Sequence, residues 1–284
     1  MKPAFQKDDT FLADVLRVLG SGGRSLWWLG QSGFLIAQNG RAILLDPYLS
    51  DSLTKKYANT DKPHVRITER VVAPGILAAS GADFDFITSS HNHTDHFDPD
   101  TLLQLLLINP LTSLVIPVAN REVSNERLGN RFSSRLRYLD DGASIVVGDI
   151  EIHGIASAHN TVERDQDGHC RFLGYVIRWG PITIYHSGDT MLHDQLVPSL
   201  RRFEIDLALL PINGDKPERR VAGNLDGPQA AKLAHLIGAR CVIPCHYDMF
   251  EFNTATPDEF TAECEHLGQA YVVLRAGERY DLSF

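Results

Sequence analysis

His91-Asn92-His93-Thr94-Asp95-His96 reads H-x-H-x-D-H and is the most informative stretch of this chain. It follows an apolar run at 84–88, so three imidazoles and a carboxylate come directly after a predicted strand. Imidazole binds Zn²⁺, Fe²⁺ and Mn²⁺ well, and a carboxylate adds a hard oxygen and negative charge. Chance placement of the twelve histidines in 284 residues does not explain so dense a cluster, and the stretch therefore predicts a metal site.

The composition is that of a globular enzyme. The chain has 43 % hydrophobic and 22 % charged residues, which is enough apolar material for a large core. A formal charge of −9 repels phosphate backbones, so general nucleic-acid binding is not expected. No apolar run is long enough to span a membrane, and the start lacks the apolar segment of a signal peptide. With only four cysteines, reduced thiols and a cytoplasmic location are expected.

Hydrophobic periodicity predicts strands and helices in mixed order along one domain, 1–284. The expected helices lie at 9–19, 69–80, 99–107, 193–202, 228–237 and 257–267. The expected strands lie at 25–29, 34–37, 42–45, 83–89, 113–117, 144–147, 151–156, 173–178, 183–186, 205–210, 240–244 and 270–274. Asp226 and Thr256 precede two of the helices and are predicted to cap them. The polar stretch 50–68 is predicted to be a long loop of the kind that forms lids.

Three further donors follow other predicted strands. His159, Asp189 and His246 each come at the carboxyl end of a β-rich run, as His91 does. Because binding sites in sheets covered by helices gather outside those strand ends, we expect these side chains to meet.

Seven donors are too many for one tetrahedral ion and divide into two sites. His91, His93 and His159 would form a three-histidine site. Asp95, His96 and His246 would form the second site, and Asp189 would bridge the two. Two divalent ions, with zinc, iron and manganese all suitable, would activate a water between them. Asp95 has a second predicted task, which is to pass a proton to the leaving group.

The H-x-H-x-D-H stretch, His159, Ser187-Gly188-Asp189-Thr190 and His246 together resemble the signature of the metallo-β-lactamase superfamily. The resemblance spans most of the chain. It implies an α+β fold, a four-layer αββα sandwich with the metals at one edge of its two sheets. Asp46 matches the family's acidic residue after an early strand, which implies that it orients a histidine ligand. The alternative for Asp46 is a turn residue before Pro47.

Within the superfamily, the stretches 173–177, 184–189 and 242–250 resemble the bacterial L-ascorbate-6-phosphate lactonase group. That resemblance implies a dinuclear metal-dependent hydrolase whose metal-bridging hydroxide opens a small lactone or ester, such as a phosphorylated sugar lactone. The same motifs resemble relatives known only as metal-dependent hydrolases. The chain also departs from the lactonases, which are longer and need not carry a match to His159, and other ester substrates therefore stay open.

Other functions on the same fold are less well supported. The alternative is a phosphodiesterase or nuclease. The acidic charge of the chain argues against it, and the segment between Asp189 and His246 is too short for an added nuclease domain. A glyoxalase-II-type thioesterase would need a helical region after the last donor, and a binding protein without activity would have lost donors.

Substrate contacts are predicted from position alone. Asn213 follows a strand and should share the rim of the site, Tyr247 follows His246 and could donate to a developing oxyanion, and Arg171 could bind a phosphate. The expected partner is a small molecule, and homo-oligomerisation is left open.

Overall fold

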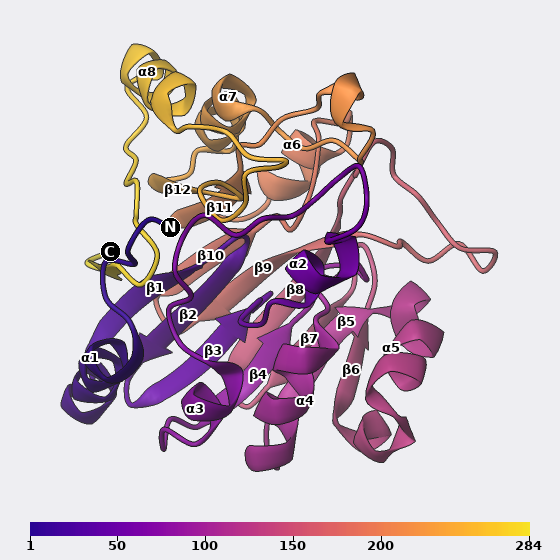
Figure 1. The fold of residues 1–284 in the computed structure, drawn as a ribbon. Helices are drawn as coiled ribbons and strands as arrows, with labels where there is room; N and C mark the ends of the chain where they lie inside the picture. Colours follow the sequence, from indigo (N-terminus) through magenta and orange to yellow (C-terminus); the bar gives the residue numbers. More distant parts are fainter.

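The computed structural model describes residues 1–284 as two β-sheets packed between layers of helices (Figure 1). The strands of the first sheet are β1 (Arg24–Gly30), β2 (Gly33–Gln38), β3 (Arg41–Leu45), β4 (Phe84–Thr88), β5 (Ser113–Pro117), β6 (Leu136–Leu139) and β13 (Arg279–Asp281). Those of the second are β7 (Ser144–Val147), β8 (Ile150–Ala156), β9 (Leu173–Trp179), β10 (Ile182–His186), β11 (Leu207–Pro211) and β12 (Cys241–Cys245). Their spatial orders are β13-β1-β2-β3-β4-β5-β6 and β12-β11-β10-β9-β8-β7.

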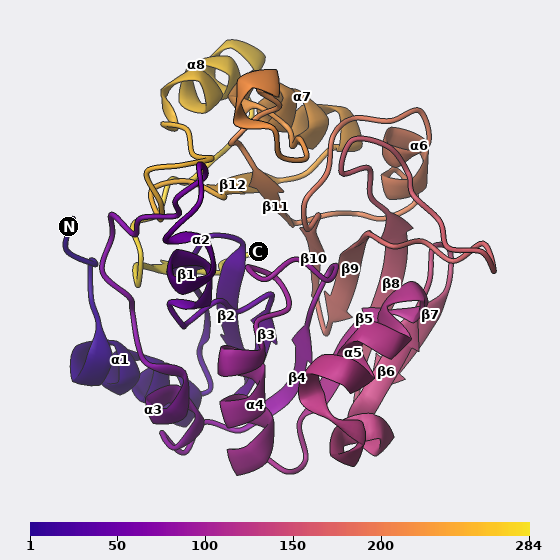
Figure 2. The same ribbon diagram turned by 45° about the vertical axis from the view of Figure 1, so that its right-hand side comes forward.

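Helices cover the outer face of each sheet. They are α1 (Asp8–Ser21), α3 (Pro74–Ala78), α4 (Pro99–Ile108), α5 (Arg121–Leu128), α6 (Leu196–Leu200), α7 (Gly227–Ile237) and α8 (Asp258–Leu267), with short 3-10 turns at Val118–Asn120, Asn130–Arg135 and Pro217–Arg219. Helix α2 (Ser52–Tyr57) instead packs through Leu53 in a small cluster with Tyr48, Met249 and Phe250. In Figure 2, α1, α3, α4 and α5 lie on the side of the first sheet and α6, α7 and α8 on the side of the second. None of these helices combines the length and apolar character that a membrane-spanning helix requires.

Strand β1 shows why four layers form. Its side chains alternate between two faces, as in any strand. Leu26 and Trp28 belong to the apolar cluster shared with the second sheet, whereas Trp27 and Leu29 belong to the cluster shared with α1 and α4. Both faces of the first sheet are therefore buried, which confirms the predicted αββα sandwich.

Most predicted elements are present, but several boundaries were wrong. Asp226 caps α7 in a complete capping box, whereas Thr256 does not cap α8, because Pro257 occupies that position. The helix expected at 69–80 shrinks to α3, and the strand expected at 270–274 is a single bridge from Tyr271 to Val242. The predicted loop 50–68 contains α2, and α5 and β6 were not predicted.

Parallel pairing brings the site together. Strands β3, β4 and β5 run parallel, as do β10, β11 and β12. The carboxyl ends of each parallel set consequently lie at one edge of their sheet. Strand β8 is antiparallel to β9, as β10 is, so it ends at the same edge as β10. The segments after β4, β8, β10 and β12 carry the predicted metal donors, which meet there.

Candidate metal centre

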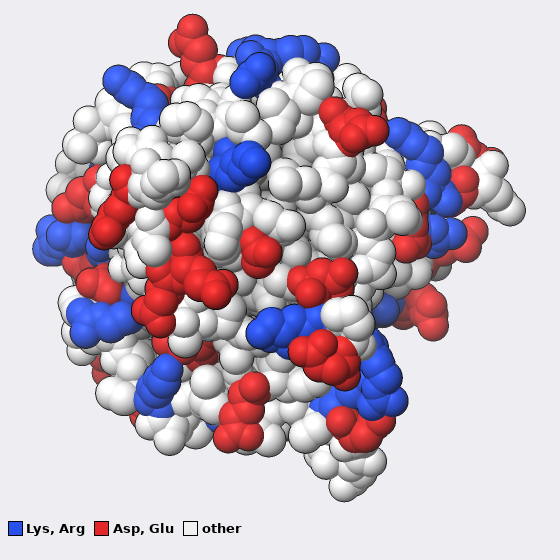
Figure 3. Space-filling view, turned by 90° about the horizontal axis from the view of Figure 1, so that it is seen from above, with Lys and Arg blue, Asp and Glu red and all other residues white.

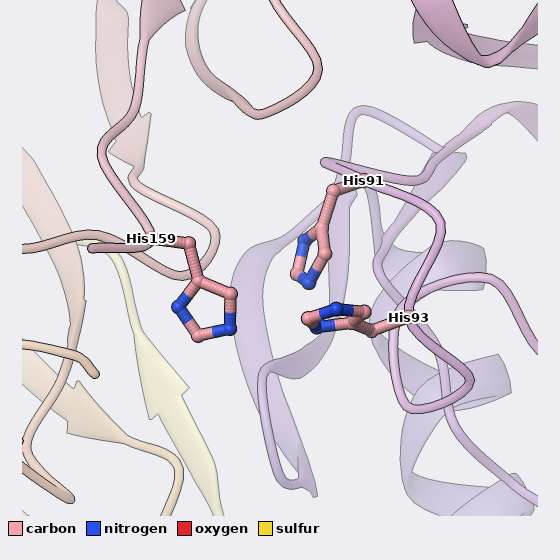
Figure 4. A group of neighbouring side chains, drawn as sticks. All are labelled: His91, His93 and His159. Carbon is pink, nitrogen blue, oxygen red and sulfur yellow. The ribbon is translucent and has the colours of Figure 1, made fainter. Parts of the chain in front are cut away.

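The seven predicted donors lie together in three overlapping groups. Each group has its ligand atoms within 4.8 Å of one another: His91, His93 and His159; Asp95, His96 and His246; and His91, His96 and Asp189. Figure 4 shows the first group, in which the rings of His91 and His93 from the loop after β4 face that of His159 from the loop after β8. The first two groups contain the residues of the two predicted sites, and the third joins Asp189 to one histidine from each.

Hydrogen bonds behind the rings fix how three of the histidines point. His159 Nδ1 lies 2.7 Å from the carbonyl oxygen of Gly223, and His96 Nδ1 lies 2.7 Å from Asp46 Oδ2. His91 Nδ1 lies 3.0 Å from Ser90 Oγ. Each Nε2 is thereby left to face the cluster, which is the usual arrangement behind metal-binding histidines. Asp46 makes the contact expected of a residue that orients a ligand.

Three buried polar atoms of the cluster have no hydrogen-bond partner. They are His91 Nε2, His96 Nε2 and Asp189 Oδ1. A buried polar atom without a partner is costly, so most such atoms in folded proteins are paired. His96 Nε2 and Asp189 Oδ1 are 3.2 Å apart without hydrogen-bond geometry. Lone pairs that converge without protein donors are what divalent cations need, and the residues present therefore fit a metal centre.

Charges inside the cluster are strongly coupled. Burial lowers the pKa of His91 well below its usual value, so His91 is neutral and ready to bind metal. Burial alone would also lower the pKa of His246, but the carboxylates of Asp189 and Asp95 outweigh it and raise that pKa to about 9. A metal ion that binds His246 near neutral pH must therefore displace a proton.

The backbone around the cluster is held in uncommon conformations. Gln31, Asp46 and His246 have φ values of 50°, 39° and 62°, which non-glycine residues rarely adopt. Such residues cluster at functional sites, where the surrounding structure enforces them. Gly188 has φ 58°, and a Cβ there would lie 2.5 Å from that of Ser90. The turn that presents Asp189 thus requires glycine.

A cavity of about 370 Å³ opens above the cluster. Its donors are His93, Asp95, His159, Asp189 and His246. The remaining lining residues are Leu53, Lys56, Tyr57, Lys62, His64, Asn92, Thr94, Arg127, Arg220, Val221, Ala222 and Asn253. This volume suits a small molecule.

Comparison with known proteins identifies the family. The profile described as "Beta-lactamase superfamily domain" matches residues 25–246, which include every predicted donor. A metal-dependent hydrolase of the UPF0173 family from Rubrobacter xylanophilus is 30 % identical over 253 residues, covering 87 % of this chain and 91 % of that protein. The chain belongs to the metallo-β-lactamase superfamily, among its UPF0173 metal-dependent hydrolases.

Solved structures share the fold of this metal-dependent hydrolase. Igni18, a metallo hydrolase from Ignicoccus hospitalis, is 21 % identical with a TM-score of 0.67, covering 92 % of this chain and 99 % of its own. An isothiocyanate hydrolase from Delia radicum gut bacteria is 18 % identical with a TM-score of 0.69, covering 92 % of this chain and all of its own (100 %). At these identities the likeness establishes the fold alone.

The three predicted substrate contacts lie outside the lining of the hydrolase's cavity. Asn213 is buried and shares hydrogen bonds with Asn224 and Asn253. Tyr247 donates its hydroxyl to the carbonyl oxygen of Leu274 and stacks on another aromatic ring, so it has no free donor for an oxyanion. Arg171 is exposed. A position after a strand does not fix the direction of a side chain, and substrate contact by these three residues stays a prediction.

Two residues near the cluster were not predicted. Gln31, in the turn between β1 and β2, donates from Nε2 to Asp95 Oδ2 at 2.9 Å, and its carbonyl oxygen accepts from the backbone N–H of His246. The ring of Phe172 lies 5.1 to 5.9 Å from the rings of all three histidines of the first site. The strand-end rule could have found Gln31, which directly follows β1, whereas nothing in the sequence singles out Phe172.

Proposed function

We propose that this hydrolase uses two divalent metal ions to open a small lactone or ester. The observation that carries the proposal is the convergence of seven donors, three of which have buried atoms without a hydrogen-bond partner. Five of the seven line a cavity of about 370 Å³. His91, His93 and His159 would hold one ion and Asp95, His96 and His246 the other, with Asp189 between them. Zinc, iron and manganese all suit imidazole and carboxylate donors.

The chain's own residues supply positioning and proton transfer. Two ions bound there would bring the pKa of a water molecule toward neutrality and polarise a substrate carbonyl. Gln31 Nε2 holds Asp95 through Oδ2, 2.9 Å away, whereas Asp95 Oδ1 makes no hydrogen bond or ion pair with another side chain. We propose that Asp95 Oδ1 accepts a proton and delivers it to the leaving oxygen. Phe172 would keep water away from the first site with its apolar ring.

A small carbonyl substrate agrees with the surface and the sequence better than a polymer does. The motifs at 184–189 and 242–250 resemble those of the lactonase group. On the face seen in Figure 3, lysine and arginine side chains stand in separate groups with acidic side chains among them. Such a surface, on a chain of charge −9, offers no continuous track for a nucleic-acid backbone.

The domain arrangement and location are proposed on similar grounds. We propose that residues 1–284 form one hydrolase domain, because β13 near the end of the chain pairs with β1 near its start. Four unpaired, buried cysteines agree with a reducing cytoplasm.

A substrate panel tests the proposed reaction. Metal-loaded protein is expected to hydrolyse at least one small lactone or carboxylic ester, and chelator should abolish the activity until Zn²⁺ or Mn²⁺ is restored. The panel includes an isothiocyanate, the substrate class named for one fold neighbour, and single-stranded RNA at moderate salt. Robust cleavage of RNA without turnover of any lactone or ester would favour the nuclease alternative instead.

A further inference from the structure

The mouth of the cavity carries an unusual concentration of positive charge. Lys56 from α2, Lys62 from the following loop, Arg127 from α5 and Arg220 all line it. The only carboxylates in the lining are Asp95 and Asp189, which belong to the metal cluster. A chain with an excess of acidic residues has therefore placed basic side chains from three separate segments around one small cavity.

Three of these cations have no acidic partner. Arg220 pairs with Asp61, whereas no carboxylate lies within ion-pair distance of Lys56, Lys62 or Arg127. Uncompensated charge at a concave site concentrates anions there and accelerates their binding. If these cations served only in a surface network of salt bridges, carboxylates would pair with them.

Two of the unpaired cations are fixed directly on the metal-binding loop. Arg127 Nη1 donates to the carbonyl oxygen of Asn92 at 2.6 Å, and Lys56 Nζ donates to Thr94 Oγ1 at 3.3 Å. Asn92 and Thr94 alternate with the donors His91, His93 and Asp95 along that loop. Lys62 is anchored to the carbonyl oxygen of Arg220. An anion held by these side chains would therefore lie next to the metal centre.

We infer that Lys56, Lys62 and Arg127 bind an oxyanion group of the substrate, a phosphate or a carboxylate, beside the metal centre. Both groups accept charge-assisted hydrogen bonds from ammonium and guanidinium donors. The substrate is then a small ester or lactone that carries a second, anionic group. This assignment of the substrate rests on the proposed function.

Direct binding tests the anion site without relying on activity. Titration calorimetry with inorganic phosphate and with succinate compares the metal-loaded wild type with the double variant Lys56→Gln/Lys62→Gln. The dissociation constant of the preferred anion is expected to rise about tenfold or more, because two charge-assisted contacts are lost. If the anion binds to the metals alone, its dissociation constant will be the same in the double variant and the wild type, and that result would overturn the inference. Lys55→Gln is the matched control, since Lys55 is the neighbouring lysine of α2 and lies outside the cavity.

A pair of esters links the site to catalysis. Mono-4-nitrophenyl glutarate and 4-nitrophenyl butyrate present the same type of reacting ester, but only the first has a free carboxylate. The double variant is expected to lower the kcat/KM of the glutarate ester, relative to that of the butyrate ester, about tenfold. Lys55→Gln should leave this ratio unchanged. An unchanged ratio together with unchanged anion affinity contradicts the inference. Lysine-dependent anion binding without turnover of either ester supports the site and counts against ester hydrolysis.

Discussion

Replacing Asp95 by asparagine is expected to lower kcat by at least about a hundredfold, the usual scale for loss of a general acid–base group. The side chain keeps its shape, and an amide oxygen can still accept from Gln31 Nε2, which lies 2.9 Å from Oδ2. What is lost is the negative charge beside His96 and His246, at 3.7 and 3.4 Å, and the ability to carry a proton. Steady-state kinetics on the best ester or lactone measures the effect.

Metal content and thermal stability must accompany those kinetics, because loss of metal also lowers apparent stability. Asp167→Asn is the charge-matched control, since Asp167 is exposed in a loop away from the cavity. Near-normal turnover by a fully metal-loaded Asp95→Asn variant would remove Asp95 from the mechanism.

Asp46→Ala is expected to weaken both the fold and the metal centre. Asp46 is fully buried and accepts hydrogen bonds from Thr88 Oγ1, from the backbone N–H and the hydroxyl of Ser90, and from His96 Nδ1. Truncation leaves these donors buried without an acceptor, which should cost about 3–5 kcal/mol of unfolding free energy. Affinity for the ion at His96 should fall about 10- to 100-fold, because the ring loses the group that orients it.

Urea unfolding of the metal-free protein and competition with a chromogenic chelator measure the two effects separately. Asp46→Asn keeps the volume and one acceptor oxygen, so its losses should be smaller than those of Asp46→Ala. If Asp46→Ala matched the wild type in both measurements, Asp46 would be no more than a turn residue before Pro47.

The spacing of apolar residues correctly predicted helices and strands whose buried side chains recur at regular intervals. The helix expected at 9–19 is α1, and the strands expected at 25–29 and 34–37 lie within β1 and β2. The helix expected at 69–80 failed because long-range pairing overrides local preference there. Backbone groups of Lys2 bond Ile67 and Glu69, and the N–H of Asp8 bonds the carbonyl oxygen of Val71. Such partners, far away in the sequence, leave no periodic signal.

The metal centre was more predictable than the cavity around it. Donors such as Asp189 and His246 follow β10 and β12, whose parallel pairing with β11 gathers side chains from distant segments. The predicted cluster is present, while the role of each side chain as a ligand stays a prediction. Lys56 and Arg127, by contrast, lie on short helices α2 and α5, which were not predicted and acquire their place only through tertiary packing.

Metal analysis of the purified protein tests the dinuclear centre most directly. The protein is stripped with chelator, reconstituted with Zn²⁺ or Mn²⁺ at pH 8 and freed of unbound metal by gel filtration. The account predicts two equivalents per chain for the wild type. His159→Ala and His246→Ala should each retain about one, because each removes a ligand from a different site. A wild-type ceiling of one equivalent, or no retained metal, would contradict the two-ion centre.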